Sequence, residues 1–186
     1  MSKDNIKQVA INHFYKFGYE GVKMAKIAED AGIRKQSLAY HYPSKRKLFT
    51  EIYQEVIEEE QQFIHSYFND SEESDIKKIL YQFLVQVKLR AYEKISSKFL
   101  QSISYSTPLE IESFITAHYF LYLDQLKNEI RRLFDQETFR FTTDECIVSF
   151  IVLYDGLITH LLYNTRQSFE YSLDTAFNVF WSGIQA

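Results

Sequence analysis

Residues 23–49 read KMAKIAEDAGIRKQSLAYHYPSKRKLF, and this stretch contains two short helical patterns on either side of a glycine. The first pattern, at about residues 23–31, places its apolar side chains three and four positions apart, as one face of a helix requires. The second, at about residues 35–41, has Leu38 as its apolar anchor. Gly32 between them can adopt the left-handed dihedrals of a tight turn. Two short helices joined in this way predict a helix-turn-helix.

The residues on both sides of this motif complete a three-helix domain. Apolar residues recur at helical spacing from Ile6 to Phe17, and Gly18 is expected to end that helix. After the motif, Pro43 disfavours helical dihedrals in the residue before it, so the second helix of the motif stops there. Ser44 is a suitable N-cap for a long fourth helix.

The helices of this region begin with basic residues. Lys23, the pair Arg34-Lys35 and the run Lys45-Arg46-Lys47 each stand at an expected helix start. A helix N-terminus carries partial positive charge, so each base there costs roughly 0.3 to 1 kcal/mol. An external polyanion removes this cost, because phosphate groups can bind both the bases and the free amides of a helix N-terminus. We therefore expect this region to face nucleic acid.

The charge of the whole chain is divided in the same way. Residues 1–49 contain ten Lys and Arg against four Asp and Glu, a net charge of +6, whereas residues 50–186 contain eleven against twenty-one, a net charge of −10. The overall net charge of −4 conceals this difference. A basic segment joined to an acidic one is typical of a nucleic-acid module attached to a body that avoids the polyanion.

The rest of the sequence predicts further helices. The chain has only five glycines and two prolines, and no segment shows a sustained alternation of apolar and polar residues. The run 69–75 contains no apolar residue and is the clearest loop apart from the turns of the motif. We expect an all-α fold of about nine helices, with helical patterns after this loop at about residues 74–94, 96–105, 108–134, 143–164 and 169–183.

The second helix of a helix-turn-helix enters the major groove and contacts base edges with its N-terminal side chains. Burial of the apolar residues of the motif would leave the others facing outward. Gln36 can pair with adenine, Arg34 or Lys35 with guanine, and Ser37 with either, while the Ala39 methyl group can contact thymine. Contacts to phosphates, which fix position without reading sequence, are assigned to Lys23, Tyr40, His41 and Lys45.

Several short motifs stand at consistent spacing within residues 5–50. They are Gly18-Tyr19-Glu20-Gly21, Ala31-Gly32-Ile33, Tyr40-His41-Tyr42, and Ser44-Lys45 followed by Leu48. Together they resemble the N-terminal domain of TetR-type transcriptional regulators, and Asp155-Gly156-Leu157 is similar to part of that family's dimerisation region. The resemblance implies a homodimeric repressor, with a DNA-binding domain at residues 1–49 and a helical ligand-binding and dimerisation domain at residues 50–186.

Three residues differ from the usual pattern of the family. Val22 stands where a threonine usually caps the second helix, and Arg34 stands where a serine usually opens the recognition helix. Loss of such a cap costs about 1 kcal/mol in an isolated helix. Ala39 replaces a tyrosine that is common in the recognition helix. These differences concern the choice of operator sequence rather than DNA binding itself.

The last two helical patterns carry more apolar residues than one small domain obviously needs. Paired across a two-fold axis they can form a four-helix dimer interface, which a palindromic operator requires. Alternatively, they form the core of a monomer. The residues assigned to the interface are Phe150, Leu157, Leu161, Phe177, Trp181 and Ile184.

A ligand pocket is assigned to side chains of the middle helices that combine apolar bodies with polar tips, as small-molecule sites do. Each of these residues taken singly also fits a core position. The expected ligand is small and either apolar or aromatic, unless the chain binds none. The assigned residues are Tyr92, Phe99, Ile103, His118, Tyr119, Tyr122 and Tyr154.

The sequence contains no pattern of a catalytic site. The five histidines lack metal-type spacing, and there is no nucleophile elbow, phosphate-binding glycine loop or dinucleotide fingerprint. We therefore expect no enzyme activity, no metal and no cofactor.

The expected location is the cytoplasm. The N-terminus lacks the pattern of a secretion signal, and a single cysteine, Cys146, fits a reducing compartment. The apolar stretch 146–163 is interrupted by Asp155, so it fits a buried helix better than a membrane span.

Two functions follow from these observations. The first is a homodimeric repressor that binds a palindromic operator in double-stranded DNA and is released by a small-molecule inducer. The second is a DNA-anchored adaptor whose acidic, aromatic-rich body binds a protein partner and has no inducer.

Overall fold

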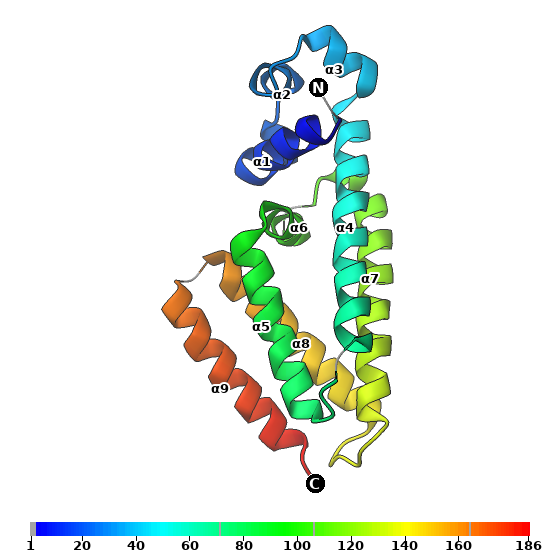
Figure 1. Ribbon diagram of the computed structural model, residues 1–186, viewed down its shortest axis with the longest axis vertical. Helices are drawn as coiled ribbons and strands as arrows, with labels where there is room; N and C mark the ends of the chain where they lie inside the picture. The colour runs from blue at the N-terminus through cyan, green and yellow to red at the C-terminus, as the bar shows by residue number, and fades with distance from the viewer. Residues whose placement is uncertain (1–2, 71, 106, 164) are drawn as a thin grey trace. The chain divides into compact units, whose positions relative to one another are not determined.

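The computed structural model describes residues 3–70, 72–105, 107–163 and 165–186 (Figure 1). The regular elements within these ranges are all helices, which confirms the expected all-α fold with nine α-helices and one short 3-10 helix. They are α1 (Lys3–Gly21), α2 (Met24–Asp30), α3 (Lys35–His41), α4 (Lys45–Asn69), α5 (Ile76–Glu93), α6 (Ile95–Tyr105), η1 (Leu109–Ile111), α7 (Glu112–Phe134), α8 (Thr143–Tyr163) and α9 (Arg166–Ile184).

The chain forms two compact units. The first unit comprises residues 1–60 and 94–120, and the second comprises residues 61–93 and 121–186. Because α6 packs against α1, it belongs to the first unit although it lies far along the sequence. This structural division therefore differs from the functional division expected at residue 49, which stays a prediction.

The first unit is built around an aromatic core. Phe14 of α1 meets Phe49 of α4 edge to face, with ring centroids 4.9 Å apart and an interplanar angle of 89°. Tyr19 contacts the same ring at 5.1 Å and 90°, and Phe99 of α6 contacts it at 5.5 Å. Edge-to-face pairs of this kind stabilise a core beyond the area that they bury. The core thus holds α1, α4 and α6 together.

Helix α1 is kinked where the sequence predicts that it ends. Gly18 has a φ of 65° and a ψ of 172°, which are not helical values, yet helical structure resumes and continues to Gly21. The expected termination at Gly18 is therefore a change of direction. The kink turns Tyr19 into the aromatic core, where it is only 3% exposed.

The turn between α2 and α3 follows the predicted glycine geometry. Gly32 has a φ of 68°, its N–H donates to the Glu29 carbonyl at 3.0 Å, and the Ile33 N–H donates to the Ala28 carbonyl at 2.9 Å. These two bonds form a Schellman motif, which satisfies carbonyls at the end of α2. The motif fixes the angle at which the chain enters α3.

The second unit is centred on Phe83 of α5. This fully buried ring stacks on Phe63 with centroids 6.0 Å apart and on Tyr154 of α8 at the same separation. Helices α8 and α9 pack against each other as a hairpin. Helix α5 is joined to α9 by polar contacts as well, since Tyr81 donates to Asp174 at 2.6 Å.

Helix α8 is the one helix of the described ranges that is long and apolar enough to cross a membrane by length and composition. Core helices of soluble proteins pass the same test. In this fold α8 contributes buried residues to the second unit, including Phe150 and Tyr154, and packs against α9.

Candidate nucleic-acid interface

Helix α3 presents nearly its whole surface to solvent. Leu38 is its one buried residue, at 1% exposure. The outward orientation predicted for the base-reading side chains is present, because the side chains that precede and follow Leu38 are all exposed. These are Arg34, Lys35, Gln36, Ser37, Ala39, Tyr40 and His41.

The C-terminal end of α3 is tied to the rest of the first unit. Tyr42, which follows α3, is 1% exposed and donates a hydrogen bond from its hydroxyl group to Glu51 Oε1 at 3.1 Å. Burial raises the pKa of Tyr42 to about 12, so the hydroxyl group remains a donor at neutral pH. Lys7 of α1 binds the same carboxylate at 2.9 Å and also contacts Glu55. This cluster joins α1, α3 and α4.

Electrostatics within the cluster favour its charged form. Burial alone would raise the pKa of Glu51, but hydrogen bonds from Lys7 and Tyr42 outweigh burial and lower it. Burial alone would lower the pKa of Lys7, but hydrogen bonds to Glu55 and Glu51 outweigh that effect and raise it. Both groups are therefore ionised at neutral pH, and α3 rests on a charged, partly buried support.

The helix starts around α3 have the charge that the sequence predicts. The first turns of α2, α3 and α4 contain no acidic residue. Lys23 and Arg34 occupy the N-cap positions of α2 and α3 in extended conformations, and neither side chain forms a cap hydrogen bond. Among the described residues, Lys23, Arg34 and Lys35 form no ion pair. Their positive charges are therefore available to an external anion.

Two cap assignments can be compared with the structure. The family resemblance places Val22 at the cap of the second helix, but Lys23 occupies that position in the structure and Val22 is buried at 4% exposure. The apolar side chain turns into the core, which places the next residue at the cap. At α4 the expected cap is confirmed, because the Lys47 N–H donates to Ser44 Oγ at 3.1 Å.

Lys45 has a different environment from the other basic residues. Its Nζ donates to the Tyr19 carbonyl at 2.7 Å and lies 4.4 Å from the centroid of the Tyr19 ring. Its side chain is 24% exposed. Lys45 therefore stabilises the segment after the kink of α1, an internal role that no sequence motif indicates. Its predicted phosphate contact stays a prediction.

The residues predicted to line a ligand pocket fall in both units. In the first unit, Phe99 and Ile103 are buried on α6, and His118 packs against Phe114 with ring centroids 4.1 Å apart. Tyr119 is half-buried. In the second unit, the hydroxyl groups of Tyr122 and Tyr154 lie 2.6 Å apart, and Tyr92 stacks under Arg166. Their role as a ligand site stays a prediction.

The residues predicted to form a dimer interface are covered by their own chain. Phe150, Leu157, Phe177, Trp181 and Ile184 are between 0% and 6% exposed, and Leu161 is half-buried. They hold α8 and α9 in the second unit and present little surface to a partner. Their role in a dimer interface stays a prediction. The two helices are apolar on two faces, and sequence alone does not show which face the chain itself covers.

The second apolar face of these helices is exposed. Val148 and Val152 on α8 are 60% and 67% exposed, and Val179 on α9 is 69% exposed. The signal was present in the sequence, since Val148 and Val152 are one helical turn apart and Gly156 continues the same line. Apolar side chains with this exposure are what a partner surface would cover.

The N-terminal part of the chain is similar to known regulators. Residues 6–52 match the family described as bacterial regulatory proteins, tetR family. The HTH-type transcriptional regulator RutR of Escherichia coli K12 is 34% identical over 56 residues, which are 30% of this chain. That alignment spans only 26% of the length of RutR.

Two comparisons extend over most of the chain. IcaR of Staphylococcus aureus strain Newman, a negative transcriptional regulator of the biofilm operon icaADBC, is 27% identical over 143 residues, covering 77% of this chain and 75% of IcaR. The crystal structure of AibR in complex with isovaleryl coenzyme A and operator DNA has a TM-score of 0.70 at 19% identity, covering 94% of this chain and 95% of AibR. The relatives by sequence are regulators rather than enzymes, in agreement with the expectation from sequence. Residues 6–52 of the chain thus match the TetR family of bacterial regulatory proteins, and the fold of the whole chain resembles that of solved TetR-type regulators.

Proposed function

We propose that this protein is a sequence-specific DNA-binding regulator that inserts α3 into the major groove. The observation that carries this proposal is the exposure of α3 on a support of buried and ion-paired side chains. One buried leucine and a following buried tyrosine hold the helix, while its polar side chains remain free to reach base edges. The name of IcaR describes a negative regulator, which supports repression as the mode of action.

The exposed residues divide into two roles. Arg34, Lys35, Gln36, Ser37 and Ala39 are proposed to contact base edges, where Arg and Lys suit guanine and Gln suits adenine. Lys23, Tyr40 and His41 are proposed to contact phosphates, which set register without reading sequence. Lys45 can add to the positive potential near the backbone, but its ammonium group is already bound to the Tyr19 carbonyl.

The proposed functional unit is a homodimer that binds a palindromic operator. Exposed apolar side chains on α8 and α9, namely Val148, Val152 and Val179, support a four-helix interface between two copies. A two-fold dimer places two recognition helices about 34 to 36 Å apart, one turn of DNA, and so matches a symmetric site. An operator in the chromosome also implies a cytoplasmic protein.

A small-molecule inducer is part of the same proposal. AibR was crystallised with isovaleryl coenzyme A, so a related fold accommodates a ligand that has an apolar acyl group. The buried pair of Tyr122 and Tyr154 offers hydroxyl groups in an apolar environment, as ligand sites often do. A protein partner in place of an inducer is the alternative outcome of the ligand tests.

Selection of bound duplexes from a random DNA library, followed by titration at several salt concentrations, tests DNA recognition. The logarithm of the affinity should fall linearly with the logarithm of salt concentration, by orders of magnitude between about 50 and 200 mM. Gln36→Ala should relax the preference at one base pair. Lys23→Gln should weaken binding to all sequences and reduce the salt slope by about 1. Lys77→Gln, at an exposed lysine of α5, is the matched control.

Sedimentation analysis tests the dimer. Val152→Glu should shift the protein toward monomer, because it places a charge on the proposed interface. Leu109→Glu changes a residue of η1 that is 88% exposed, and it should leave the oligomeric state unchanged. A monomeric wild-type protein that still binds a symmetric duplex tightly would contradict the proposed assembly.

A further inference from the structure

A groove lies between α1 and α2 on the first unit. Its volume is about 540 Å³, within the range of roughly 300 to 1,000 Å³ that is usual for small-molecule sites. Six of its lining residues matter here: Val9, His13, Lys16, Phe17, Lys23 and Lys26. We call it the α1–α2 groove; none of the residues assigned above to the inducer pocket lines it.

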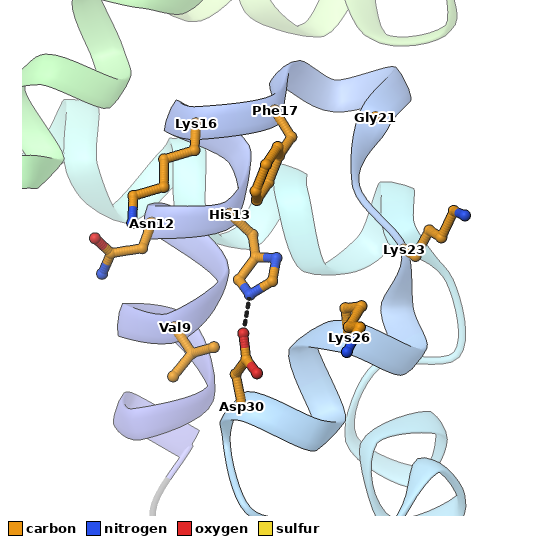
Figure 2. Close-up of a pocket in the computed structure, with 9 residues that line it drawn as sticks. All are labelled: Val9, Asn12, His13, Lys16, Phe17, Gly21, Lys23, Lys26 and Asp30. Atoms are coloured by element: carbon orange, nitrogen blue, oxygen red, sulfur yellow. Dashed lines mark hydrogen bonds and ion pairs between the residues drawn. The ribbon is translucent and has the colours of Figure 1, made fainter.

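The interior of the α1–α2 groove is aromatic and apolar. Figure 2 shows the rings of Phe17 and His13 next to each other in the space between the two helices, with Val9 on the same side. The two ring centroids are 5.7 Å apart, with an interplanar angle of 52°. Phe17 is 58% exposed, so most of its ring is available to a ligand. A flat ring could stack on this surface and remove it from water.

The fold holds the two sides of the groove at a fixed separation. His13 Nε2 of α1 lies 2.7 Å from Asp30 Oδ2 of α2, and Figure 2 shows this pair bridging the helices. At the other end, a Cβ atom on Gly21 would approach Phe17 Cβ to 3.2 Å, so the glycine lets the chain pass close to the base of the Phe17 side chain. The groove is therefore built into the packing of α1 and α2.

The charges around the groove favour an anion at its rim. Lys16 and Lys23 are exposed and form no ion pair among the described residues. Lys26 is 2.6 Å from Glu29, and the Asp30 carboxylate is occupied by His13. An anionic group would thus be attracted to Lys16 and Lys23 and kept away from Asp30, while an attached ring reaches Phe17.

We propose that the α1–α2 groove binds a small organic anion with a planar aromatic body, and that this binding lowers the affinity of the protein for DNA. The second part rests on the proposed function, because Lys23 both lines the groove and is a proposed phosphate contact. An anion that engages Lys23 competes directly with a DNA phosphate. This regulation acts at the DNA-binding surface itself and needs no change in the second unit.

The probe for the test is 2-naphthoate, which joins a flat ring system to one carboxylate. Its binding to the full chain is followed by NMR through the Val9 methyl signals, which are assigned by comparison with Val9→Ile. We expect saturable shifts of these signals. The neutral analogue 2-naphthalenemethanol should bind at least about fivefold more weakly, because it lacks the charge that Lys16 and Lys23 attract. Equal affinity for the two probes would overturn the anion selectivity.

Variants locate the site. Phe17→Ala and Lys16→Gln should each weaken naphthoate binding, by at least about tenfold for Phe17→Ala. Phe120→Ala is the matched control, since Phe120 is 55% exposed on α7 and does not line the groove. Circular dichroism checks that each variant keeps its helices. Unmoved Val9 signals, or equal affinity in Phe17→Ala and Phe120→Ala, would overturn the proposed site.

A DNA titration separates this inference from the proposed function. Naphthoate should raise the apparent dissociation constant of the wild-type complex with a selected duplex and should have little effect on the Phe17→Ala complex. If naphthoate leaves the apparent dissociation constant of the wild-type DNA complex unchanged, the regulatory part of the proposal is wrong and the proposed function stands. Naphthoate binding without any DNA binding would leave the groove site intact but would remove both the proposed function and its regulation.

Discussion

Replacing Arg34 with aspartate should make the protein more stable and a weaker DNA binder. Arg34 is the N-cap of α3, with a φ of −71° and a ψ of 147°, and it provides no cap hydrogen bond. These extended dihedrals suit a capping aspartate, which would accept a hydrogen bond from the backbone N–H of Gln36 or Ser37. A good cap contributes about 1 kcal/mol, and exchanging a cation for an anion at a helix N-terminus adds about 0.6 to 2 kcal/mol.

The expected gain is therefore about 1.6 to 3 kcal/mol in the free energy of unfolding. In a chain of this length, each kcal/mol corresponds to roughly 2 to 4 °C in the midpoint of thermal unfolding. Urea titrations and thermal melts, both followed by circular dichroism, measure this gain in stability. Fluorescence anisotropy with a selected duplex should show a loss of affinity of about tenfold or more, because a carboxylate replaces a guanidinium group at the DNA surface.

The control is Arg34→Gln, which removes the charge but supplies a poor cap. It should weaken DNA binding while changing stability by less than about 1 kcal/mol. Unfolding of Arg34→Asp at a lower urea concentration than the wild type would contradict the capping role proposed for this position. Equal affinity of the aspartate variant and the wild type for the duplex would show that Arg34 does not face the DNA.

Three further predictions concern the support of α3 and α1. Gly18→Ala should destabilise the protein by about 1 to 3 kcal/mol in a urea titration, because Gly18 has a φ of 65° and a ψ of 172°, a combination that is essentially restricted to glycine, and no atom within 4 Å limits the new Cβ, so backbone strain alone acts. Because the pKa of Glu51 is lowered from its ordinary 4.5, its stabilising contribution is present above that pH and is lost as the pH falls through the lowered value. Glu51→Gln should therefore lower stability at pH 7 and flatten its decline in acid, whereas parallel pH curves would contradict the ion pair with Lys7. Lys45→Ala should lower the midpoint of thermal unfolding by removing its bond to the Tyr19 carbonyl, at a cost of about 1.5 to 3 kcal/mol, while Lys47→Ala, at an exposed residue, should not.

The helix-turn-helix could be predicted from the sequence because local rules determine it. Gly32 needs a positive φ, and Leu38 is the one apolar residue that α3 can bury. Both features appear in a short window of sequence, and so does the Ser44 cap of α4. The exposure of the α3 side chains follows from the same window, since burying Leu38 turns the others outward.

The packing of distant helices could not be predicted in the same way. Helix α6 joins the first unit because Phe99 fits against Phe49, a contact between residues about fifty positions apart. The identity of the covered face on α8 and α9 likewise depends on which neighbours are present. Phe150 and Val152 are both apolar, yet the first is fully buried and the second is 67% exposed. Periodicity shows that a face is apolar, but only the tertiary structure shows what covers it.

Comparing Lys45 with Arg34 shows when a basic residue at the start of a helix is evidence for DNA binding. Each adds positive charge at a helix N-terminus, and each carries a similar cost in the isolated helix. For Lys45 the fold offsets that cost internally, since the ammonium group binds the Tyr19 carbonyl and lies against the Tyr19 ring. For Arg34 the described residues offer no ion-pair partner. A cost that the fold leaves uncompensated points to a function that requires the charge, so the bases at the starts of α2 and α3 support DNA contact more strongly than Lys45 does.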